Sequence, residues 1–269
     1  MELLYFGKEV GTLKRIGIIG GMSYESTLHY YEAINRQVNE RAGGLVSADL
    51  VLRSVNFEEY HKLMEVGDWE EIAHKLSFEA LDLVLKNNCD YVAIATNTMH
   101  KVASEVIGPH EVVNGAVWPH VSSWVDIPLV HIGDCIGEKC KATGARTVLL
   151  LGTKHTMCDE FMIDFLRTNY GLDALNDLVD SNEVQEVHRI IFEELCHGKI
   201  VAKSEEFLTE LIRDISFECM EQGLSPSLDA VILGCTELNM ILDPDNLDIP
   251  LIDSTQAHID KLVDLCLEN

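Results

Sequence analysis

The sequence has few basic side chains and no long apolar segment. Its 269 residues contain 20 Lys and Arg against 45 Asp and Glu, which gives a formal net charge of −25. Such a balance opposes the phosphate neutralisation that supplies most nucleic-acid affinity. The longest apolar runs have the length of strands, well short of the roughly 20 residues that span a bilayer. These absences argue against nucleic-acid and membrane partners, whereas a small anionic substrate could still be bound by local N–H donors.

Paired cysteines and a targeting signal are also lacking. The eight cysteines form no C-x-x-C pair, which is the pattern of zinc ribbons and dithiol redox sites. No basic and then apolar signal opens the sequence. We therefore expect free thiols, a cytoplasmic location and no metal. The glycine turn at Gly20 and Gly21 does not match G-x-G-x-x-G, so we expect no dinucleotide site.

Apolar residues are plentiful, at 47% of the chain, and their periodicity predicts alternating strands and helices. The order strand, helix, strand, helix, strand favours a parallel sheet with helical crossovers. The predicted elements of the first half are a strand from Lys14, a helix over 27–41, a strand within 45–57, a helix over 68–87 and a strand ending at Thr96.

The second half of the sequence repeats the first. Residues 146–156 echo the opening strand and turn, before a predicted helix over 157–169, and residues 230–237 echo 91–98. Both halves then contain a strand that begins with Ile-Pro, at a position where proline is tolerated. We predict an α/β protein of two pseudo-symmetric, Rossmann-like units with parallel sheets.

The predicted units are residues 1–132 plus 252–269 and residues 133–251. The first half carries an insertion around 108–124, and residues 1–13 have no predicted role beyond a packed extension or hairpin.

The chemistry is predicted at the ends of two buried strands. The apolar run 230–233 stops at Gly234 and is followed by Cys235, and Thr96 occupies the equivalent place in the first half. Open α/β sheets bind ligands at the carboxyl edge of their strands. An ordinary buried cysteine is the alternative interpretation. The strand end and the repeat favour a catalytic pair, Cys235 and Thr96.

Two loops add candidate substrate-binding groups. Residues 20–27 and 152–156 place backbone N–H groups and hydroxyls at helix starts, where carboxylates bind, although helix capping alone, including a Thr156–Asp159 capping box, would also explain them. His100 could tune a nearby acid, or it could be structural or exposed. Lys199 and Arg53 could receive a substrate side-chain carboxylate, or both could be solvated surface positions. The predicted substrate-binding residues are Met22, Ser23, Thr27, Asn97, Thr98, Thr153, Thr156, Lys199, Thr236 and Glu237.

The sequence resembles the aspartate/glutamate racemase family, the amino-acid racemases that use no pyridoxal phosphate. The matching stretches are residues 18–27, 95–101, 151–157, 187–196 and 233–237. The resemblance implies an active site between two α/β domains, no cofactor, an amino-acid substrate and commonly a dimer. It also implies two acid/base residues, usually both cysteines, on either side of the substrate Cα.

Here the second of these residues is Cys235, whereas the first is Thr96 in place of cysteine. A thiol can be tuned to a thiolate by nearby N–H groups or His⁺, but a threonine hydroxyl is a much weaker acid. We therefore expect Cys235 to be the base, toward the L-enantiomer by resemblance, and Thr96 to be the opposite proton donor. The departure puts symmetric two-thiol racemisation in doubt.

Two other functions remain open. The same scaffold could isomerise or decarboxylate a small dicarboxylate. Alternatively, the chain could be a weakly catalytic amino-acid-binding or regulatory protein, as Thr96 suggests.

Overall fold

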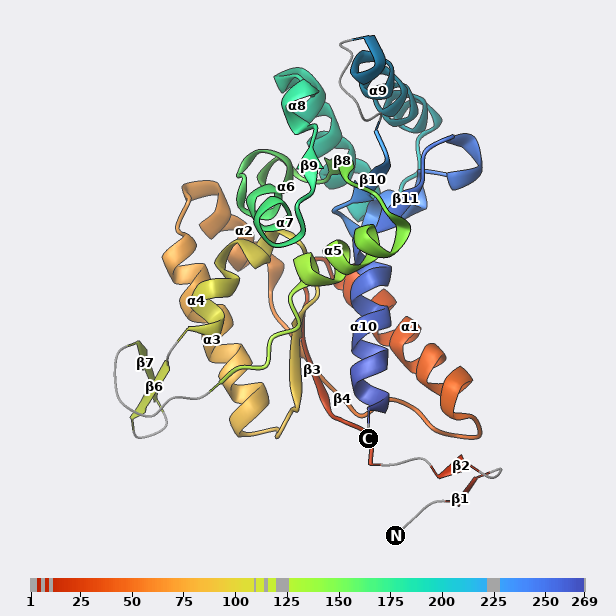
Figure 1. The fold of residues 1–269 in the computed structure, drawn as a ribbon. Helices are drawn as coiled ribbons and strands as arrows, with labels where there is room; N and C mark the ends of the chain where they lie inside the picture. The colour runs from red at the N-terminus through yellow and green to blue at the C-terminus, as the bar shows by residue number, and fades with distance from the viewer. Residues whose placement is uncertain are drawn as a thin grey trace. The chain divides into compact units, whose positions relative to one another are not determined.

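The computed structural model describes residues 4–5, 8–9, 12–108, 110–113, 116–119, 126–221 and 228–268. By its internal contacts the chain divides into two units (Figure 1). Unit 1 comprises Met1–His131 and Ile259–Asn269, and unit 2 comprises Ile132–His258.

Unit 1 is built on a parallel sheet in the order β4-β3-β5, formed by β4 (Leu50–Ser54), β3 (Ile16–Gly20) and β5 (Tyr91–Ile94). Leu129 extends the sheet beyond β5 through a parallel bridge to Val92. Apolar side chains of β3 and β5 are buried because helices cover both faces of the sheet, the arrangement that all-parallel sheets require.

In Figure 1, helices α2 (Phe57–Val66) and α3 (Trp69–Leu85) lie on one side of this sheet, and α1 (Tyr24–Ala42) lies on the other beside the end of α10 (Ser254–Leu267). The chain after β5 forms η1 (Thr98–Val102), α4 (Ala103–Ile107) and an antiparallel pair, β6 (His110–Val113) and β7 (Ala116–Pro119). A second short antiparallel pair, β1 (Leu4–Tyr5) and β2 (Lys8–Glu9), precedes β3.

Unit 2 contains a parallel sheet in the order β11-β10-β8-β9, from β11 (Leu251–Asp253), β10 (Ala230–Leu233), β8 (Thr147–Leu151) and β9 (Asp173–Ala174). Successive residues of β8 and β10 enter two different cores: Leu149 and Leu151 pack into one, whereas Val148 and Leu150 pack into the other. This alternation follows from the two-residue period of a strand, and it explains the continuous apolar runs in the sequence.

The helices of unit 2 follow in chain order: α5 (Ile132–Thr143), α6 (Lys154–Cys158), α7 (Phe161–Tyr170), η2 (Asn176–Leu178), α8 (Ser181–Arg189), the π-helix η3 (Ile190–Glu194), η4 (Leu195–His197), α9 (Ala202–Glu221), η5 (Thr236–Met240), η6 (Pro244–Asn246) and the start of α10.

The two sheets share one strand order, which confirms the predicted α/β fold with parallel sheets. In unit 1 the first strand, β3, lies between the second and the third, and the fourth segment, at Leu129, follows the third. In unit 2 the strands β9, β8, β10 and β11 repeat this order. The predicted insertion falls partly on β6 and β7, while residues 109, 114–115 and 120–124 lie outside the described residues.

Several local details differ from the sequence predictions. The predicted helix over 157–169 is two helices, α6 and α7, separated at Glu160, whose φ is +53°. Helix α2 was missed because its acidic sequence resembles a solvated face. Unit 2 ends at His258 and not at the predicted residue 251, because β11 pairs with β10 of unit 2 before α10 continues into unit 1.

Helix α1 was predicted correctly, but not the side that it buries. Leu28, Tyr31, Ile34 and Val38 recur at helical spacing in the sequence, which predicts that they share a buried face, whereas the structure buries Tyr30, Ile34 and Val38 and leaves Leu28 and Tyr31 exposed.

Candidate active site

Each unit contributes one group of candidate residues, which we call its half-site. The half-site of unit 1 lies where β5 ends. The N–H of Thr96 donates to the Ile94 carbonyl at 2.8 Å, closing a tight turn at the strand end, and the Thr96 side chain is partly exposed. Within the described residues the Thr96 hydroxyl has no hydrogen-bond partner. No carboxylate or imidazole of unit 1 is therefore seen to act as a base on this hydroxyl, which suits a proton donor better than a base.

The residues after Thr96 are buried. Asn97, Thr98 and His100 are only 4%, 6% and 3% exposed. The ring of His100 bonds the Thr96 carbonyl oxygen, with Nδ1 at 2.8 Å, and not the Thr96 hydroxyl. The sequence suggested that His100 tunes an acid, but its observed contact is with the backbone.

The loop between β3 and α1 uses its hydroxyls internally. The N–H of Gly21 donates to Thr27 Oγ1 at 2.8 Å, and this hydroxyl donates to the Ser23 carbonyl at 3.0 Å. Ser23 caps α1 by accepting from the N–H of Ser26 at 3.3 Å, while Met22 is buried. Capping is thus realised, and substrate contacts by Met22, Ser23 and Thr27 stay predictions.

Ser26 was missed by the sequence reasoning. Its hydroxyl donates to the Ala95 carbonyl at 3.3 Å and so joins the first turn of α1 to the residue before Thr96. The sequence signal for this role is only that Ser26 lies in the first turn of a helix capped by Ser23.

The half-site of unit 2 lies where β10 ends. The N–H of Gly234 donates to the Leu151 carbonyl at 2.6 Å. A Cβ atom at position 234 would lie 2.9 Å from both that oxygen and a methyl group of Leu150. Only glycine allows β8 and β10 to remain this close at the turn that presents Cys235, which is why the apolar run stops there.

Three side chains donate hydrogen bonds to the carboxylate of Glu237, which is only 6% exposed. Cys235 Sγ lies 2.9 Å from Oε2, the Thr236 hydroxyl donates to the same oxygen, and Cys196 Sγ lies 4.0 Å from Oε1. Thr236 and Glu237, predicted as substrate-binding residues, are therefore parts of the immediate surroundings of the Cys235 thiol.

These surroundings raise the pKa of Cys235 well above its ordinary value. Burial is the main cause, followed by the negative charge of Glu237 and the hydrogen bond that its carboxylate accepts, with a smaller contribution from Cys196. The backbone N–H of Glu237 acts in the opposite direction. The sequence allowed for tuning toward the thiolate, whereas within this unit the Glu237 carboxylate beside the thiol favours the protonated form.

Cys196 reaches Glu237 through an unusual helical segment. Helix α8 continues into the π-helix η3 and the tight turn η4, which carries Cys196. At the other end, His188 Nδ1 accepts from the N–H of Lys154 at 3.3 Å. Within this segment the wider turn of the π-helix interrupts the α-helical period between residues 188 and 196. The segment thereby contacts the loops after both β8 and β10.

The same segment is braced by charged groups. Arg189 pairs with Glu186 and Glu194, and Ser204 donates to Glu194 at 2.7 Å. Although burial raises the pKa of Glu194, the hydrogen bonds from Ser204 and Arg189 outweigh it and leave that pKa below its ordinary value. Burial raises the pKa of Cys196 to about 12, so it stays a neutral donor. Its role could not be read from the sequence, which gives no sign of the π-helix.

The loop after β8 contains two buried threonines. Thr153 Oγ1 lies 3.3 Å from Thr156 Oγ1, and the N–H of Thr156 donates to the Thr153 carbonyl at 2.8 Å. The expected capping box of Thr156 and Asp159 is not formed, because Thr156 lies within α6 and Asp159 contacts His155 at 2.9 Å.

The two candidate cations are exposed. Lys199 follows Gly198, which adopts a left-handed conformation at the end of η4, and its side chain faces solvent. Arg53 forms a two-pronged ion pair with Glu79, with Nη2 2.8 Å from Oε1. The pair borders an open hollow of about 560 Å³ in unit 1, lined also by Asn56, Tyr60 and Lys75. A role in substrate binding stays a prediction for both cations.

Fold and half-sites together define a class: an α/β protein made of two similar units, each with polar groups at the carboxyl edge of its sheet and one with a thiol paired to a carboxylate. The model of the family described as Asp/Glu/Hydantoin racemase matches residues 19–262. The chain belongs to this family, whose racemases are isomerases.

Solved structures of similar proteins support the same family and fold. A Yersinia pestis protein assigned to the Asp/Glu racemases is 34% identical with a TM-score of 0.78, and the match covers 95% of this chain and 100% of that one. An aspartate racemase homologue from Pyrococcus horikoshii is 32% identical with a TM-score of 0.74, over the same shares of the two chains. Aspartate racemase of Picrophilus torridus, 20% identical over 93% of each chain with a TM-score of 0.58, supports the fold.

Among the described residues, no group of three or more His, Cys, Asp and Glu side chains is arranged to hold a metal ion. None of the helices in the described part of the chain is both long and apolar enough to cross a bilayer.

Proposed function

We propose that the protein is a cofactor-independent racemase of aspartate, glutamate or both, which removes and returns the proton at Cα. Cys235 is the base and Thr96 is the proton donor on the opposite face. The observation that carries the proposal is the Cys235–Glu237 pair at the end of β10, in a chain of the racemase family.

The raised pKa of Cys235 dictates how the thiol becomes a base. At neutral pH the thiol keeps its proton, so it first passes that proton to Glu237 Oε2, 2.9 Å away. The resulting thiolate then takes the Cα proton, which leaves the Cys235–Glu237 pair neutral and the negative charge on the substrate carbanion.

The second half of the reaction uses Thr96. Its hydroxyl gives a proton to the carbanion, and the alkoxide left behind regains a proton that derives, through solvent, from Glu237. Because a hydroxyl is a far weaker acid than a thiol, this step limits the rate. Enantiomers have equal free energy in achiral water, so kcat/KM is the same in both directions, and any difference in turnover is matched in KM.

The test is incubation with L-aspartate or L-glutamate in D₂O without pyridoxal phosphate. We expect D-product carrying deuterium at Cα, and loss of this activity in Cys235→Ala. The exposed thiol variant Cys158→Ala is the control and should retain activity. Product free of deuterium, or an active Cys235→Ala protein, would refute the mechanism.

A second candidate function is an amino-acid-binding or regulatory protein with weak catalysis. The protonated thiol beside a carboxylate, together with a Thr96 hydroxyl that contacts no base within the described residues, favours it. Thermal stabilisation by aspartate without exchange of the α-proton would support this function over the racemase. Turnover of maleate or a malonate would instead indicate dicarboxylate isomerisation or decarboxylation.

The homodimer and the cytoplasmic location expected from the resemblance and the composition also stay predictions. Sedimentation equilibrium over a range of protein concentrations tests the first, and fractionation of the source cells tests the second.

A further inference from the structure

Both backbone groups of Thr96 are held within unit 1. Its N–H donates to the Ile94 carbonyl at 2.8 Å, and its carbonyl oxygen lies 2.8 Å from His100 Nδ1. The first bond belongs to the turn that ends β5. The second comes from a side chain four residues later, so the direction in which Thr96 leaves the strand depends on the ring of His100.

The acceptor determines the tautomer of that ring. A carbonyl oxygen can only accept, so Nδ1 of His100 must carry the hydrogen. This N–H is present in the neutral and in the protonated imidazole alike. The bond to Thr96 therefore depends on a donor at the Nδ1 position and not on the charge of the ring.

His100 has little freedom to move. It is 3% exposed, and its backbone N–H donates to the Asn97 carbonyl at 3.0 Å. Its ring meets the ring of His131 edge to face, with centroids 4.7 Å apart and planes at 78°. His131 is itself placed by the neighbouring strand segment, where the N–H of Val130 donates to the Val92 carbonyl at 2.8 Å.

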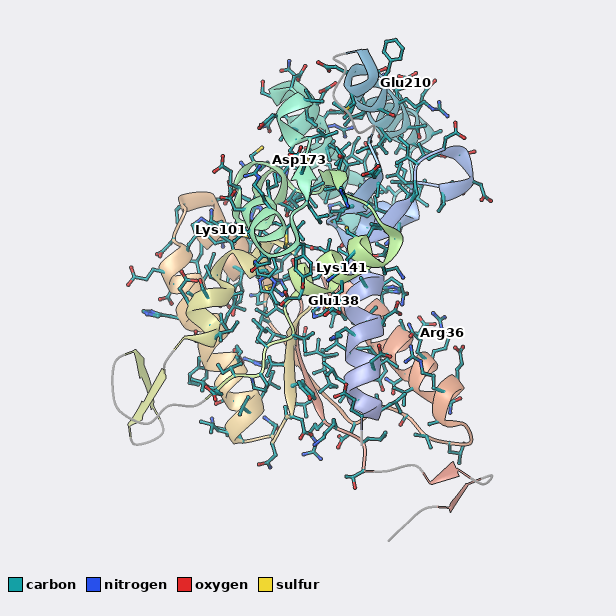
Figure 2. The ribbon with its side chains drawn as sticks, viewed as in Figure 1. Arg36, Lys101, Glu138, Lys141, Asp173 and Glu210 are labelled. Atoms are coloured by element: carbon teal, nitrogen blue, oxygen red, sulfur yellow. The ribbon has the colours of Figure 1, made fainter. Side chains whose placement is uncertain are left out.

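The turn that carries His100 is also anchored from α3. Lys101, labelled in Figure 2, comes next in the chain, and its Nζ lies 4.2 Å from the centroid of the Trp69 ring. We therefore expect a change at His100 to remove the bond to the Thr96 carbonyl while Lys101 keeps its contact with Trp69.

We propose that His100 is a positioning residue for Thr96: its Nδ1–H holds the Thr96 carbonyl and so fixes where the Thr96 hydroxyl points. The inference rests on the proposed function, in which that hydroxyl must lie on one face of the substrate Cα. A misplacement of about 1 Å can cost on the order of 100-fold in rate, so a fixed backbone has catalytic value here.

The decisive comparison is His100→Asn with His100→Leu. Asparagine places an amide N–H where histidine has Nδ1, whereas leucine has nearly the same shape and no donor. We expect His100→Asn to stay within about threefold of the parent, and His100→Leu to lose at least about tenfold in kcat of α-proton exchange with little change in KM. The pH profile of His100→Asn should match the parent, because the ring acts as a donor and not as a titrating acid.

Equal losses in both variants, or none in His100→Leu, would overturn the proposal. If His100→Leu fails to fold, His100→Gln takes its place, because its amide lies one bond farther out and should not reach the carbonyl in the same way. Thermal unfolding of each variant, beside the exposed-histidine control His74→Leu, separates loss of fold from loss of position.

A second measurement does not depend on racemisation. In a Thr96→Cys background, the alkylation rate of the new thiol reports its position, with the exposed Cys158 as internal reference. We expect His100→Leu to change this rate more than threefold and His100→Asn to leave it unchanged. If the alkylation rates change as expected but the protein has no racemase activity, only the proposed function is refuted. If His100→Leu and His100→Asn give equal alkylation rates, the role of His100 is refuted.

Discussion

The thiol of Cys235 donates to the carboxylate of Glu237 across 2.9 Å, so the candidate base and its nearest charge form one proton-sharing pair. A carboxylate beside a thiol opposes formation of the thiolate. It also offers a place for the thiol proton once substrate has bound. The chemistry of the site depends on this pair rather than on the cysteine alone.

Replacing Glu237 by glutamine tests that dependence. Glu237→Gln removes the charge and the acceptor that raise the pKa of Cys235, so the pKa should fall, although burial, the largest cause, keeps it above the ordinary value. The pH dependence of Cys235 alkylation by iodoacetamide measures the shift. Racemisation should fall at least about tenfold, because the proton acceptor is lost. An unchanged alkylation profile would show that the two groups are not coupled.

The effect of Cys196 is predicted separately. Cys196→Ala removes the donor at Glu237 Oε1, and we expect a shift in the alkylation profile of Cys235 and a several-fold loss of exchange activity. Cys196→Ser retains a donor and should recover part of the loss. The control is Cys219→Ala, which removes a buried thiol from the core of the same unit. If the Cys219 variant behaves like the Cys196 variant, general loosening of the unit explains both.

Restoring a thiol at Thr96 should increase the rate. A thiol is a much stronger acid than a hydroxyl. Within the described residues no side chain forms a hydrogen bond with the Thr96 hydroxyl, so the substitution removes no observed hydrogen bond. We expect Thr96→Cys to increase deuterium exchange at Cα at least about tenfold. Thr96→Ser, which keeps a hydroxyl, should stay near the parent rate. If Thr96→Cys does not increase the exchange rate, proton donation by residue 96 is not the step that limits the enzyme.

Buried thiols should make the fold sensitive to alkaline pH. Burial raises the pKa of Cys140 to about 11, so the folded state keeps this proton after the unfolded state has lost it. Its contribution to stability is complete below about pH 9 and is lost as pH rises toward 11, about 3 kcal/mol for this thiol. Urea unfolding at several pH values measures the slope. Cys140→Ala should make the slope shallower, and an identical slope would contradict the assignment.

Much of the fold could be predicted because its determinants are local. Continuous apolar runs indicate strands buried on both faces, and β8 and β10 indeed send alternate residues into two cores. Capped amphipathic segments indicate helices, as at Ser23 and Asp68, which both cap the helices that follow them. The internal repeat indicated two units, and the shared strand order of the two sheets confirmed it.

The surroundings of the candidate catalytic residues could not be predicted in the same way. Cys196 and Glu237 are far apart in the chain and meet where η4, which follows the π-helix η3, contacts η5. The contact from His100 to the Thr96 carbonyl requires a particular ring orientation within a tight turn. Neither feature leaves a periodic trace in the sequence.

By itself, the amino-acid sequence determined the α/β class, the duplication and the strand ends at Thr96 and Cys235, because strand and helix periods and glycine positions are properties of neighbouring residues. The tertiary structure alone decided that the nearest charge to Cys235 is a carboxylate and that Thr96 is held by a histidine through its backbone. Glu237 and His100 are only two and four residues from Cys235 and Thr96, but the protonation state of a thiol and the direction of a hydroxyl depend on burial and side-chain orientation, which only the packed structure defines.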